Sequence, residues 1–556
     1  MQIGIDVGGT FTDGVLIENA QVLRSCKVPT DSQALLKSIV HVLEKLIEEK
    51  TEKISRIVVS TTLMTNLILE KKYLPTGLIL IPGPGLNLKE HKFPFSWEII
   101  TGGVDFQGRI IKNLNEQEIV KKVQCLVDKG IQHLGIIGKF SPRNPSLEIQ
   151  TAEIVNRYFP TLEVKLGHQV TGQLNFIRRA MGTGLYLATY KTFAQFIASL
   201  KNALKERDIT CPVFILKADG GVIPIDKIMN FTIDTVLSGP AASSFGAKSL
   251  LPEKTSAFVM DIGGTTTDFS LILDGNPLLA SRGVKISDVY TPVRSLAIHS
   301  LPIGGDTGIE IKNNQVTLTF KREGPPACCG GNTPTLTDCM RILNLTDLGD
   351  ENKARLSFQS LSSKLDLSAE IIAQQALDKA VELITQEINY IFKQWQEEPL
   401  YRIWQLLNEK NIKPRNLISI GGPGKPLGEL VSKKMNLTHI NHPLCQVANA
   451  IGAALASPTY EETIRINTEK REISSSWGYF SKNSRQIKGK MSAEEAAGLA
   501  LQIFKKYLQE NGVEAQPEIY HQEVFNMVRG WSTTGQIHEI KLGVPVQVTG
   551  LINNKE

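Results

Sequence analysis

The stretch IGIDVGGTFTDGVLI at residues 3–17 decides the fold, because VMDIGGTTTDFSLIL at residues 259–273 repeats its pattern in register. Each copy is an apolar run that ends in an aspartate, then a Gly-Gly turn, then a second run that opens with threonine and aspartate. Paired glycines let the backbone take positive φ, and they let its N–H groups approach a ligand without a Cβ in the way. One such turn is common in ordinary hairpins. Two turns in register predict two related lobes.

The chemistry of these turns suits a bound nucleotide. Hydroxyls and backbone N–H groups bind phosphate oxygens, and a carboxylate at a strand end suits a hydrated Mg²⁺. We therefore predict that the two hairpins hold a nucleotide between the lobes. The candidate nucleotide-binding residues of the hairpins are Gly8, Gly9, Thr10, Thr12, Gly263, Gly264, Thr265, Thr266 and Thr267.

Bulk composition narrows the class of protein. A chain of 556 residues exceeds one core and suggests two to four domains. Its net charge of +5 is small, and no basic block appears, so nucleic acid is not implied. We find no export signal and no apolar run of about 20 residues that could span a membrane, which predicts a cytoplasmic protein. The seven scattered cysteines favour free thiols over disulfides or a zinc site.

Strand-like runs alternate with amphipathic helices over most of the length, which indicates an α/β protein. Helices are expected at residues 32–49, 182–207, 364–396 and 493–509. Residues 457–491 are rich in Ser, Lys, Arg and Glu, and we interpret them as a linker. Residues 492–556 would then form a small α+β tail with two strand-like runs, PEIYHQEVF and HEIKLGVPVQV.

Four glycine-rich turns follow one another in an order that resembles the actin-like ATPase superfamily. They are the first hairpin, SGPAAS at residues 238–243, the second hairpin, and SIGGPG at residues 419–424. The resemblance implies a two-lobed actin-like ATPase fold of duplicated ribonuclease H-like domains, with the α+β tail as an appendage. VANAIGAALA at residues 447–456, a helix of small residues, would be the second connecting element.

The superfamily resemblance also implies roles for individual residues. Ser238 and Gly239 would contact the nucleotide from the first connecting helix, and Gly421, Gly422 and Gly424 would abut the adenosine. Asp6 and Asp261 would be catalytic and lie near Mg²⁺, far apart in an open cleft and converging on closure. Asp13 and Asp268 are further catalytic candidates. They are equally suited to cap hairpin N–H groups through Asx-type bonds.

Longer runs resemble one branch, the hydantoinase A and 5-oxoprolinase family, over roughly the first 455 residues. The runs that carry this resemblance are IGIDVGGTFTD, STTLMTNLILEKK (60–72), ILKADGGVIP (215–224), VLSGPAASSFGA (236–247), VMDIGGTTTDFSLI (259–272) and GPPACCGGNTPTLTDCMRIL (324–343). The resemblance divides the chain into an N-terminal lobe at residues 1–170 and a second lobe at residues 171–456.

This family resemblance implies an ATP-dependent hydrolase that opens a cyclic amide such as a hydantoin, 5-oxoproline or a related lactam. Transfer of the γ-phosphoryl group to the carbonyl oxygen would make that oxygen a good leaving group. The expected cofactors are ATP and Mg²⁺, with Mn²⁺ or a monovalent cation as additions. A separate hydantoinase B-type partner subunit is expected, and a homo-oligomer is left open.

The segments expected to face the substrate differ from the family pattern. Ser60 stands where the family has histidine, FIRRAMGTG replaces its Glu-Arg-Thr segment, and PIGGDTG replaces its GAGGGS turn. The candidate substrate residues are Thr61, Thr62, Thr65, Asn66, Arg178, Arg179, Asp219 and Asp306. Five of them have a structural alternative: Thr61 and Thr62 suit a helix N-cap, the two arginines suit surface ion pairs, and Asp219 suits a turn. For His439 and His442 we favour a strand end over a metal site.

Two other functions stay open at this point. One is an ATPase that remodels a partner protein, as the reactivating factors of cobalamin-dependent dehydratases do. The other is a small-molecule kinase that releases a stable phosphate ester. The runs at 60–72 and 324–343 favour the amidohydrolase over both.

Overall fold

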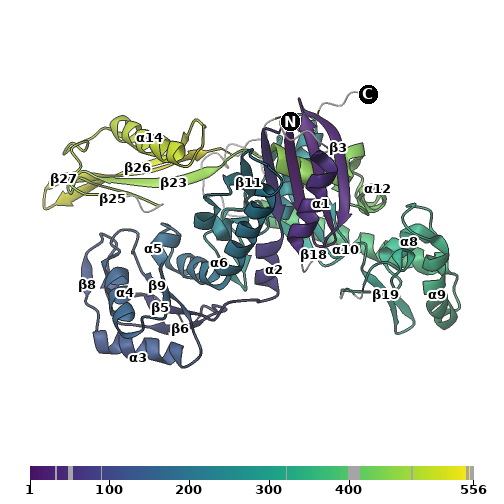
Figure 1. The fold of residues 1–556 in the computed structure, drawn as a ribbon, viewed down its shortest axis with the longest axis horizontal. Helices are drawn as coiled ribbons and strands as arrows, with labels where there is room; N and C mark the ends of the chain where they lie inside the picture. Colours follow the sequence, from purple (N-terminus) through teal and green to yellow (C-terminus); the bar gives the residue numbers. More distant parts are fainter. Residues whose placement is uncertain are drawn as a thin grey trace.

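The computed structural model describes residues 1–31, 34–47, 54–88, 90–320, 322, 324–397, 414–476, 480–545, 550 and 552. In Figure 1 the blue inserted domain and the yellow C-terminal sheet lie on one side of the first lobe. Helices α8 (Leu336–Ile342) and α9 (Glu351–Leu365) of the second lobe lie on the opposite side. The hairpins that the sequence repeats are at the centre, one in each lobe.

The first lobe is built on a six-stranded sheet of order β12-β11-β4-β1-β2-β3. Its strands are β1 (Gln2–Val7), β2 (Phe11–Glu18), β3 (Gln21–Pro29), β4 (Arg56–Thr61), β11 (Val213–Leu216) and β12 (Val222–Pro224). Strand β1 pairs antiparallel with β2 and parallel with β4. Strand β1 is covered on both faces, because Ile3, Ile5 and Val7 are buried on one face and Gly4 and Asp6 on the other. Helix α1 (Leu35–Ile47) covers part of this sheet, and residues 32, 33, 48 and 49 of the predicted helix lie outside the described residues.

The second lobe repeats the same strand order. Its sheet runs β15-β14-β13-β21-β22, and β18 adds to β14. The strands are β13 (Ala257–Ile262), β14 (Thr267–Leu273), β15 (Asn276–Pro277), β18 (His299–Leu301), β21 (Asn416–Ile420) and β22 (Thr438–Ile440). As in the first lobe, the leading strand β13 pairs antiparallel with the hairpin strand and parallel with the next strand. Helices α10 (Ala369–Glu397) and α12 (Gly424–Met435) pack on this lobe.

A separate parallel sheet is inserted between β4 and β11. Its order is β10-β9-β5-β6, and helices α3 (Glu116–Val127) and α4 (Ser146–Tyr158) cover one face. The strands are β5 (Thr76–Ile81), β6 (Ser96–Ile99), β9 (His133–Gly138) and β10 (Glu163–Leu166). The 30-residue helix α6 (Phe176–Lys205) packs on the other face and leads the chain back to β11.

This insertion corrects the predicted boundary at residue 170. Strands β11 and β12 lie beyond that boundary in sequence, yet they complete the first lobe's sheet. Strands β4 and β11 are parallel, and parallel neighbours require a long crossover connection. The inserted sheet and α6 are that crossover, so the first lobe extends to about β12.

Two helices of small residues lie between the lobe sheets, α7 (Ser238–Leu250) and α13 (Ala448–Leu455). A Cβ added to Gly452 would lie 2.0 Å from the Ala242 carbonyl oxygen, and one added to Gly246 would lie 1.9 Å from that of Ala448. A Cβ added to Gly4 of β1 would lie 2.0 Å from the Ala450 carbonyl oxygen. The helix of small residues predicted at residues 447–456 is therefore confirmed, and its small side chains let it pack closely. It brings both sheets into one buried apolar cluster.

The linker predicted at residues 457–491 is wrong. These residues contain β23 (Tyr460–Asn467), β24 (Glu472–Ser475) and β25 (Phe480–Ser481), which form one sheet with β26 (Glu518–Arg529) and β27 (Ser532–Val544). Buried and more exposed residues alternate along β23, so its charged residues fall between buried ones. Average composition hides this period of two. Helix α14 (Ala493–Glu510) packs on the sheet as predicted, and residues 546–548 of the last predicted run lie outside the described residues.

No helix in the described part of the chain is long and apolar enough to cross a membrane. All seven cysteines are free, as predicted.

Candidate functional site

The two hairpins place their aspartates identically. In the first lobe Asp6 is opposite Asp13 across the β1–β2 pair, and in the second lobe Asp261 is opposite Asp268 across β13–β14. The turn amides close the hairpins in the same way, because Gly8 N donates to the Phe11 oxygen at 3.0 Å and Gly263 N to the Thr266 oxygen at 2.9 Å. The duplication seen in the sequence is thus a duplication of backbone geometry.

Two glycines of these turns, Gly8 and Gly264, are needed for space, and none is needed for positive φ. None of Gly8, Gly9, Gly263 and Gly264 has a left-handed φ, which corrects the sequence argument. A Cβ on Gly264 would lie 2.6 Å from Asp306 Oδ2 and 3.0 Å from Thr10 Oγ1. The second contact shows that the two hairpins approach each other closely. The Cβ position of Gly9 has no atom within 4 Å, so its backbone borders open space.

The strand-end aspartates of the two lobes share one amide. Asn449 Nδ2 at the start of α13 donates to Asp6 Oδ2 at 3.3 Å and to Asp261 Oδ2 at 3.2 Å. The carboxylates expected to converge on closure therefore already lie on either side of one side chain. Asn449 was not among the predicted residues. Its place in a run of alanines at a helix start was the available signal.

Asp6 is buried, and Asp261 is half-buried. Burial raises the pKa of Asp6 to about 7, and the charges of Asp13 and Asp261 add to the rise. Burial also raises the pKa of Asp261, which accepts a hydrogen bond from the Ser243 hydroxyl of α7. Oδ1 of Asp6 is buried and has no hydrogen-bond partner among the residues described. An approaching cation would find a free oxygen there.

Asp13 and Asp268 have different partners in the two lobes. Lys27 Nζ lies 2.6 Å from Asp13 Oδ1, whereas Asp268 accepts a hydrogen bond from the Ser300 hydroxyl. Burial raises the pKa of both carboxyls, that of Asp268 to about 7. In the described part of the chain, neither side chain accepts a bond from a hairpin N–H, so the Asx alternative is not observed.

The hairpin threonines fall into two groups. Thr12 and Thr267 are fully buried, and their hydroxyls bond to Thr30 Oγ1 at 2.9 Å and to the Ile303 oxygen at 2.6 Å. These two hydroxyls face the protein and not the space between the hairpins. Thr10, Thr265 and Thr266 are at least partly exposed at the turns.

The remaining predicted nucleotide residues surround the same place. Ser238 is buried and donates to the Thr61 oxygen at 3.1 Å, while the Cβ position of Gly239 is 4.0 Å from Asp6 Oδ1. Gly421 has φ +88°, and its Cβ position is 2.2 Å from the Ile262 oxygen, so this turn requires glycine. No atom lies within 4 Å of the Cβ position of Gly422, and Gly424 begins α12.

This arrangement fits a hydrated magnesium ion and a nucleotide. Mg²⁺ keeps several waters and takes only one or two carboxylates beside phosphate oxygens, which matches Asp6 and Asp261. Among the described residues no group of three or more His, Cys, Asp or Glu side chains could hold a metal ion alone. His439 and His442 bond instead to Ser419 Oγ at 2.7 Å and to Leu444 N at 3.1 Å, as expected for structural residues.

The predicted substrate residues are divided among three places. Thr61, Thr62 and Asn66 lie at the start of α2 (Leu63–Leu69), where Thr61 Oγ1 accepts from Leu63 N at 3.2 Å. Asp306 is elsewhere, against the second hairpin: its N–H donates to the Gly264 oxygen at 2.7 Å, and Arg322 Nη2 lies 2.8 Å from its Oδ2.

Arg178 and Asp219 line a cavity of about 740 Å³ that lies away from the hairpins. Asp219 is also a turn residue, since it accepts from Gly221 N at 3.0 Å. Arg179 is fully buried and donates to the backbone oxygens of Gln173 and Gly138, so it makes neither the substrate contact nor the surface ion pair considered for it. Thr65 accepts from Leu237 N at 2.9 Å and joins α2 to the start of α7.

The sheets of the two lobes have the same strand order, and each carries one of the paired hairpins. With the connecting helices between them, they define a two-lobed actin-like fold. The hydantoinase/oxoprolinase family matches residues 188–462, and the N-terminal region of that family matches residues 2–159. The chain belongs to the hydantoinase/oxoprolinase family.

Two relatives match large parts of the chain. An uncharacterized protein of Methanocaldococcus jannaschii is 25% identical over 85% of this chain and 75% of its own length. The caprolactamase subunit alpha of Pseudomonas jessenii is 23% identical over 61% of this chain and 53% of its own length, so the chain spans about half of that relative.

Two solved structures share the fold. Nucleotide-free acetone carboxylase superposes with a TM-score of 0.73 at 18% identity, covering 99% of this chain and 88% of that one. The ATP-dependent caprolactamase of Pseudomonas jessenii superposes with a TM-score of 0.67 at 16% identity, covering 98% of this chain and 87% of that one.

Proposed function

We propose that the chain binds Mg²⁺-ATP between its lobes and uses it to activate the carbonyl group of a cyclic amide for hydrolysis. The observation that carries this proposal is the meeting of Asp6 and Asp261 at Asn449, with a glycine turn beside each carboxylate. The names of the family and of the caprolactamase relative support an amide as the substrate class.

The residues of the chain have separable tasks in this proposal. When bound, ATP supplies a γ-phosphoryl group that turns a carbonyl oxygen into a leaving group. Asp6 and Asp261 hold the hydrated cation, and the turn amides near Gly9 and Gly422 face the phosphates and the adenosine. Lys27 balances the charge of Asp13, which lies opposite Asp6 in the first hairpin. The chain's contribution is positioning and charge stabilisation.

We also propose a partner subunit. The caprolactamase relative is named as subunit alpha, and this chain spans 53% of it. The water that opens the ring then attacks either in this chain or in that partner.

The test is Mg²⁺-dependent ADP release by the purified chain, alone and with hydantoin, 5-oxoproline, 2-pyrrolidone and caprolactam. Stimulation by one ring compound, together with its ring-opened product, supports the proposal. Steady hydrolysis that no ring compound changes favours the partner-remodelling ATPase, and a stable phosphorylated product favours the small-molecule kinase.

Asp6→Asn and Asp261→Asn should each abolish ADP release while the chain stays folded. Asp226→Asn is the matched control, because Asp226 is an exposed residue paired with Lys201 at 2.6 Å. Unchanged hydrolysis in both hairpin variants would contradict the assignment of the site.

A further inference from the structure

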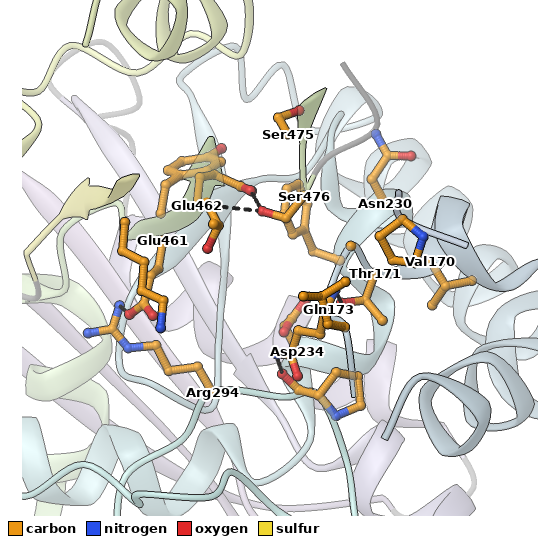
Figure 2. A pocket seen from close by; sticks show the side chains of 18 of the residues that line it. Val170, Thr171, Gln173, Asn230, Asp234, Arg294, Glu461, Glu462, Ser475 and Ser476 are labelled. Carbon is orange, nitrogen blue, oxygen red and sulfur yellow. Dashed lines mark hydrogen bonds and ion pairs between the residues drawn. The ribbon is translucent and has the colours of Figure 1, made fainter. Parts of the chain in front are cut away.

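The 740 Å³ cavity lies where the first lobe, the segment after α5 (Gly167–Val170) and the C-terminal sheet meet. Figure 2 shows its walls: Thr171 and Gln173 from that segment, Asp234 from η2 (Ile228–Thr235), and Glu462 and Ser476 from the C-terminal sheet. The hairpin residues do not line it. Its size is that of a small-molecule site.

Two ion pairs lie in its walls, among further charged residues that include Arg178, Arg465 and Glu539. Lys217 Nζ lies 3.4 Å from Asp219 Oδ2 and donates to the Thr459 oxygen at 2.8 Å. Arg294 Nη1 lies 2.8 Å from Glu461 Oε2. These pairs leave neither of the two cations free to attract an anion into the interior of the cavity.

Three carboxyl groups of the walls are in neither pair, those of Asp234, Glu462 and Glu539, and the first two are buried deeply enough for their pKa values to rise. Within the described residues the structure shows no hydrogen bond or ion pair to the side chain of Asp234, whereas Glu462 is bonded to the Ser476 hydroxyl. Burial raises the pKa of Asp234 to about 6 and that of Glu462 to about 8. The raised pKa favours the protonated form of Glu462, and Asp234 is an acceptor to which no described side chain donates.

Tyr460 supplies the complementary group. Its side chain is 2% exposed, it lines the cavity, and its hydroxyl has no hydrogen-bond partner in the part of the chain described. A buried hydroxyl left unpaired costs roughly 1–3 kcal/mol, which a ligand oxygen would recover. The ring forms an aromatic wall with Phe231 at 5.8 Å and Tyr507 at 6.0 Å between ring centroids, both edge to face.

An unpaired donor, an unpaired acceptor and an aromatic wall complement a small ring with one amide edge. A cyclic amide is held cis, so its carbonyl oxygen and its N–H lie on the same edge of the ring. We propose that this cavity binds the cyclic amide substrate, with the Tyr460 hydroxyl donating to the carbonyl oxygen and the Asp234 carboxylate accepting from the N–H. The choice of ligand rests on the function proposed above.

A short segment connects the cavity to the nucleotide site. Leu237 comes shortly after Asp234 in the chain, and its φ of 61° is left-handed. Gly239 comes next but one, and its Cβ position is 4.0 Å from Asp6 Oδ1. Non-glycine residues hold such a φ only where surrounding contacts impose it, and here Leu237 N donates to Thr65 Oγ1 at 2.9 Å. In the chain, Asp234 is thus a few residues from Gly239, which lies beside the carboxylate that would hold the cation.

The test measures binding by calorimetry without nucleotide, using 2-pyrrolidone and N-methyl-2-pyrrolidone, which lacks the N–H. The wild-type chain should bind 2-pyrrolidone about tenfold or more tightly than the methylated ring, because only the first can donate to a carboxylate. Asp234→Asn should weaken 2-pyrrolidone about tenfold and leave the methylated ring unchanged. Tyr460→Phe keeps the ring and should weaken both ligands about threefold to tenfold.

Tyr390→Phe is the matched control, since Tyr390 is exposed on α10 in the other lobe. No binding of either lactam to the wild-type chain overturns the inference, and so do equal affinities in wild type, Asp234→Asn and Tyr460→Phe. Lactam-stimulated ADP release that neither variant alters would overturn this site and leave the proposed function standing. Amide-selective binding in a chain that never hydrolyses ATP would overturn the proposed function and leave this site standing.

Discussion

Asp6 and Asp261, which end equivalent strands of different lobes, lie on either side of a single amide nitrogen, at 3.3 Å and 3.2 Å. Two buried carboxylates this close repel each other, and the shared donor Asn449 offsets part of that repulsion. The contact makes α13 the element that sets the spacing of the two lobes at the site. It also means that one side chain controls both proposed cation ligands.

Asn449→Ala should therefore lower the rate of ATP hydrolysis by about tenfold to a hundredfold, the effect of losing hydrogen bonds to charged groups. Steady-state ADP release measures this loss. Asn202→Ala, at an exposed position on α6, is the matched control and should leave the rate unchanged. A rate for Asn449→Ala equal to wild type would show that the shared amide has no part in the chemistry.

The stability of the chain should depend on pH through Asp6. Its pKa in the folded chain is about 7, raised from 3.8 by burial, so the folded state holds a proton that the unfolded chain has lost. This stabilisation is complete below about pH 4 and is lost as the pH rises through 7. Between about pH 5.5 and about pH 8 the free energy of unfolding should fall by about 2 kcal/mol. Asp6→Asn should remove this contribution to the pH dependence. The contribution of Asp268, whose pKa is also raised, should remain.

Magnesium should stabilise the chain more at high pH than at low pH, the opposite of the effect of the proton on Asp6. A cation binds the ionised carboxylates and competes with the proton, so Mg²⁺-ADP should raise the melting temperature more at about pH 8 than at about pH 5.5. Melts with ADP and a chelator supply the control for the nucleotide itself. An equal shift at both pH values would argue against Asp6 and Asp261 as cation ligands.

Gly452→Ala should destabilise the chain by about 3 kcal/mol, because the new methyl group would meet the Ala242 backbone oxygen at 2.0 Å. Gly498→Ala is the matched change in another helix. No atom lies within 4 Å of the Cβ position of Gly498, so that variant should gain about 0.5–1 kcal/mol from helix propensity. Denaturant unfolding measures the free energy of unfolding of both variants. Equal values for the two would refute the tight contact between α7 and α13.

Arg178 should select for a carboxylate on the ring. It lines the cavity, its guanidinium lies 5.6 Å from the centre of the Tyr290 ring, and it has no ion pair among the described residues. The wild-type chain should bind 5-oxoproline more tightly than 2-pyrrolidone, by about tenfold for one charge-assisted contact, and Arg178→Gln should remove the difference. Arg282→Gln is the control, because Arg282 is 5.9 Å from the same ring and does not line the cavity. A preference that persists in Arg178→Gln would place the carboxylate elsewhere.

The local elements were largely predictable from the sequence. Buried strands such as β1 and β13 are short apolar runs, and α10 and α14 follow helical periodicity, so their signals lie within a few turns of chain. The errors arose where the signal was averaged or non-local. The composition of residues 457–491 concealed the alternation of β23, and no local pattern showed that β11 rejoins a sheet begun at β1.

The candidate residues divide in the same way. Asp6 and Asp261 could be named because each hairpin repeats the other within a few residues, and the structure confirms that they lie together. Asn449, Tyr460 and Asp234 could not, since each comes from a different element and acquires its meaning only from what the fold brings beside it.

The sequence by itself determined the duplicated hairpin, its glycines and aspartates, and the order of the turns, because backbone conformation and strand pairing in a hairpin depend on neighbours in the chain. Only the tertiary structure decided that one amide joins the two aspartates, that Thr12 and Thr267 face inward, and that the C-terminal sheet closes a cavity beside Asp234. Those facts depend on packing between distant segments, where burial and the pairing of polar groups are settled by the whole fold.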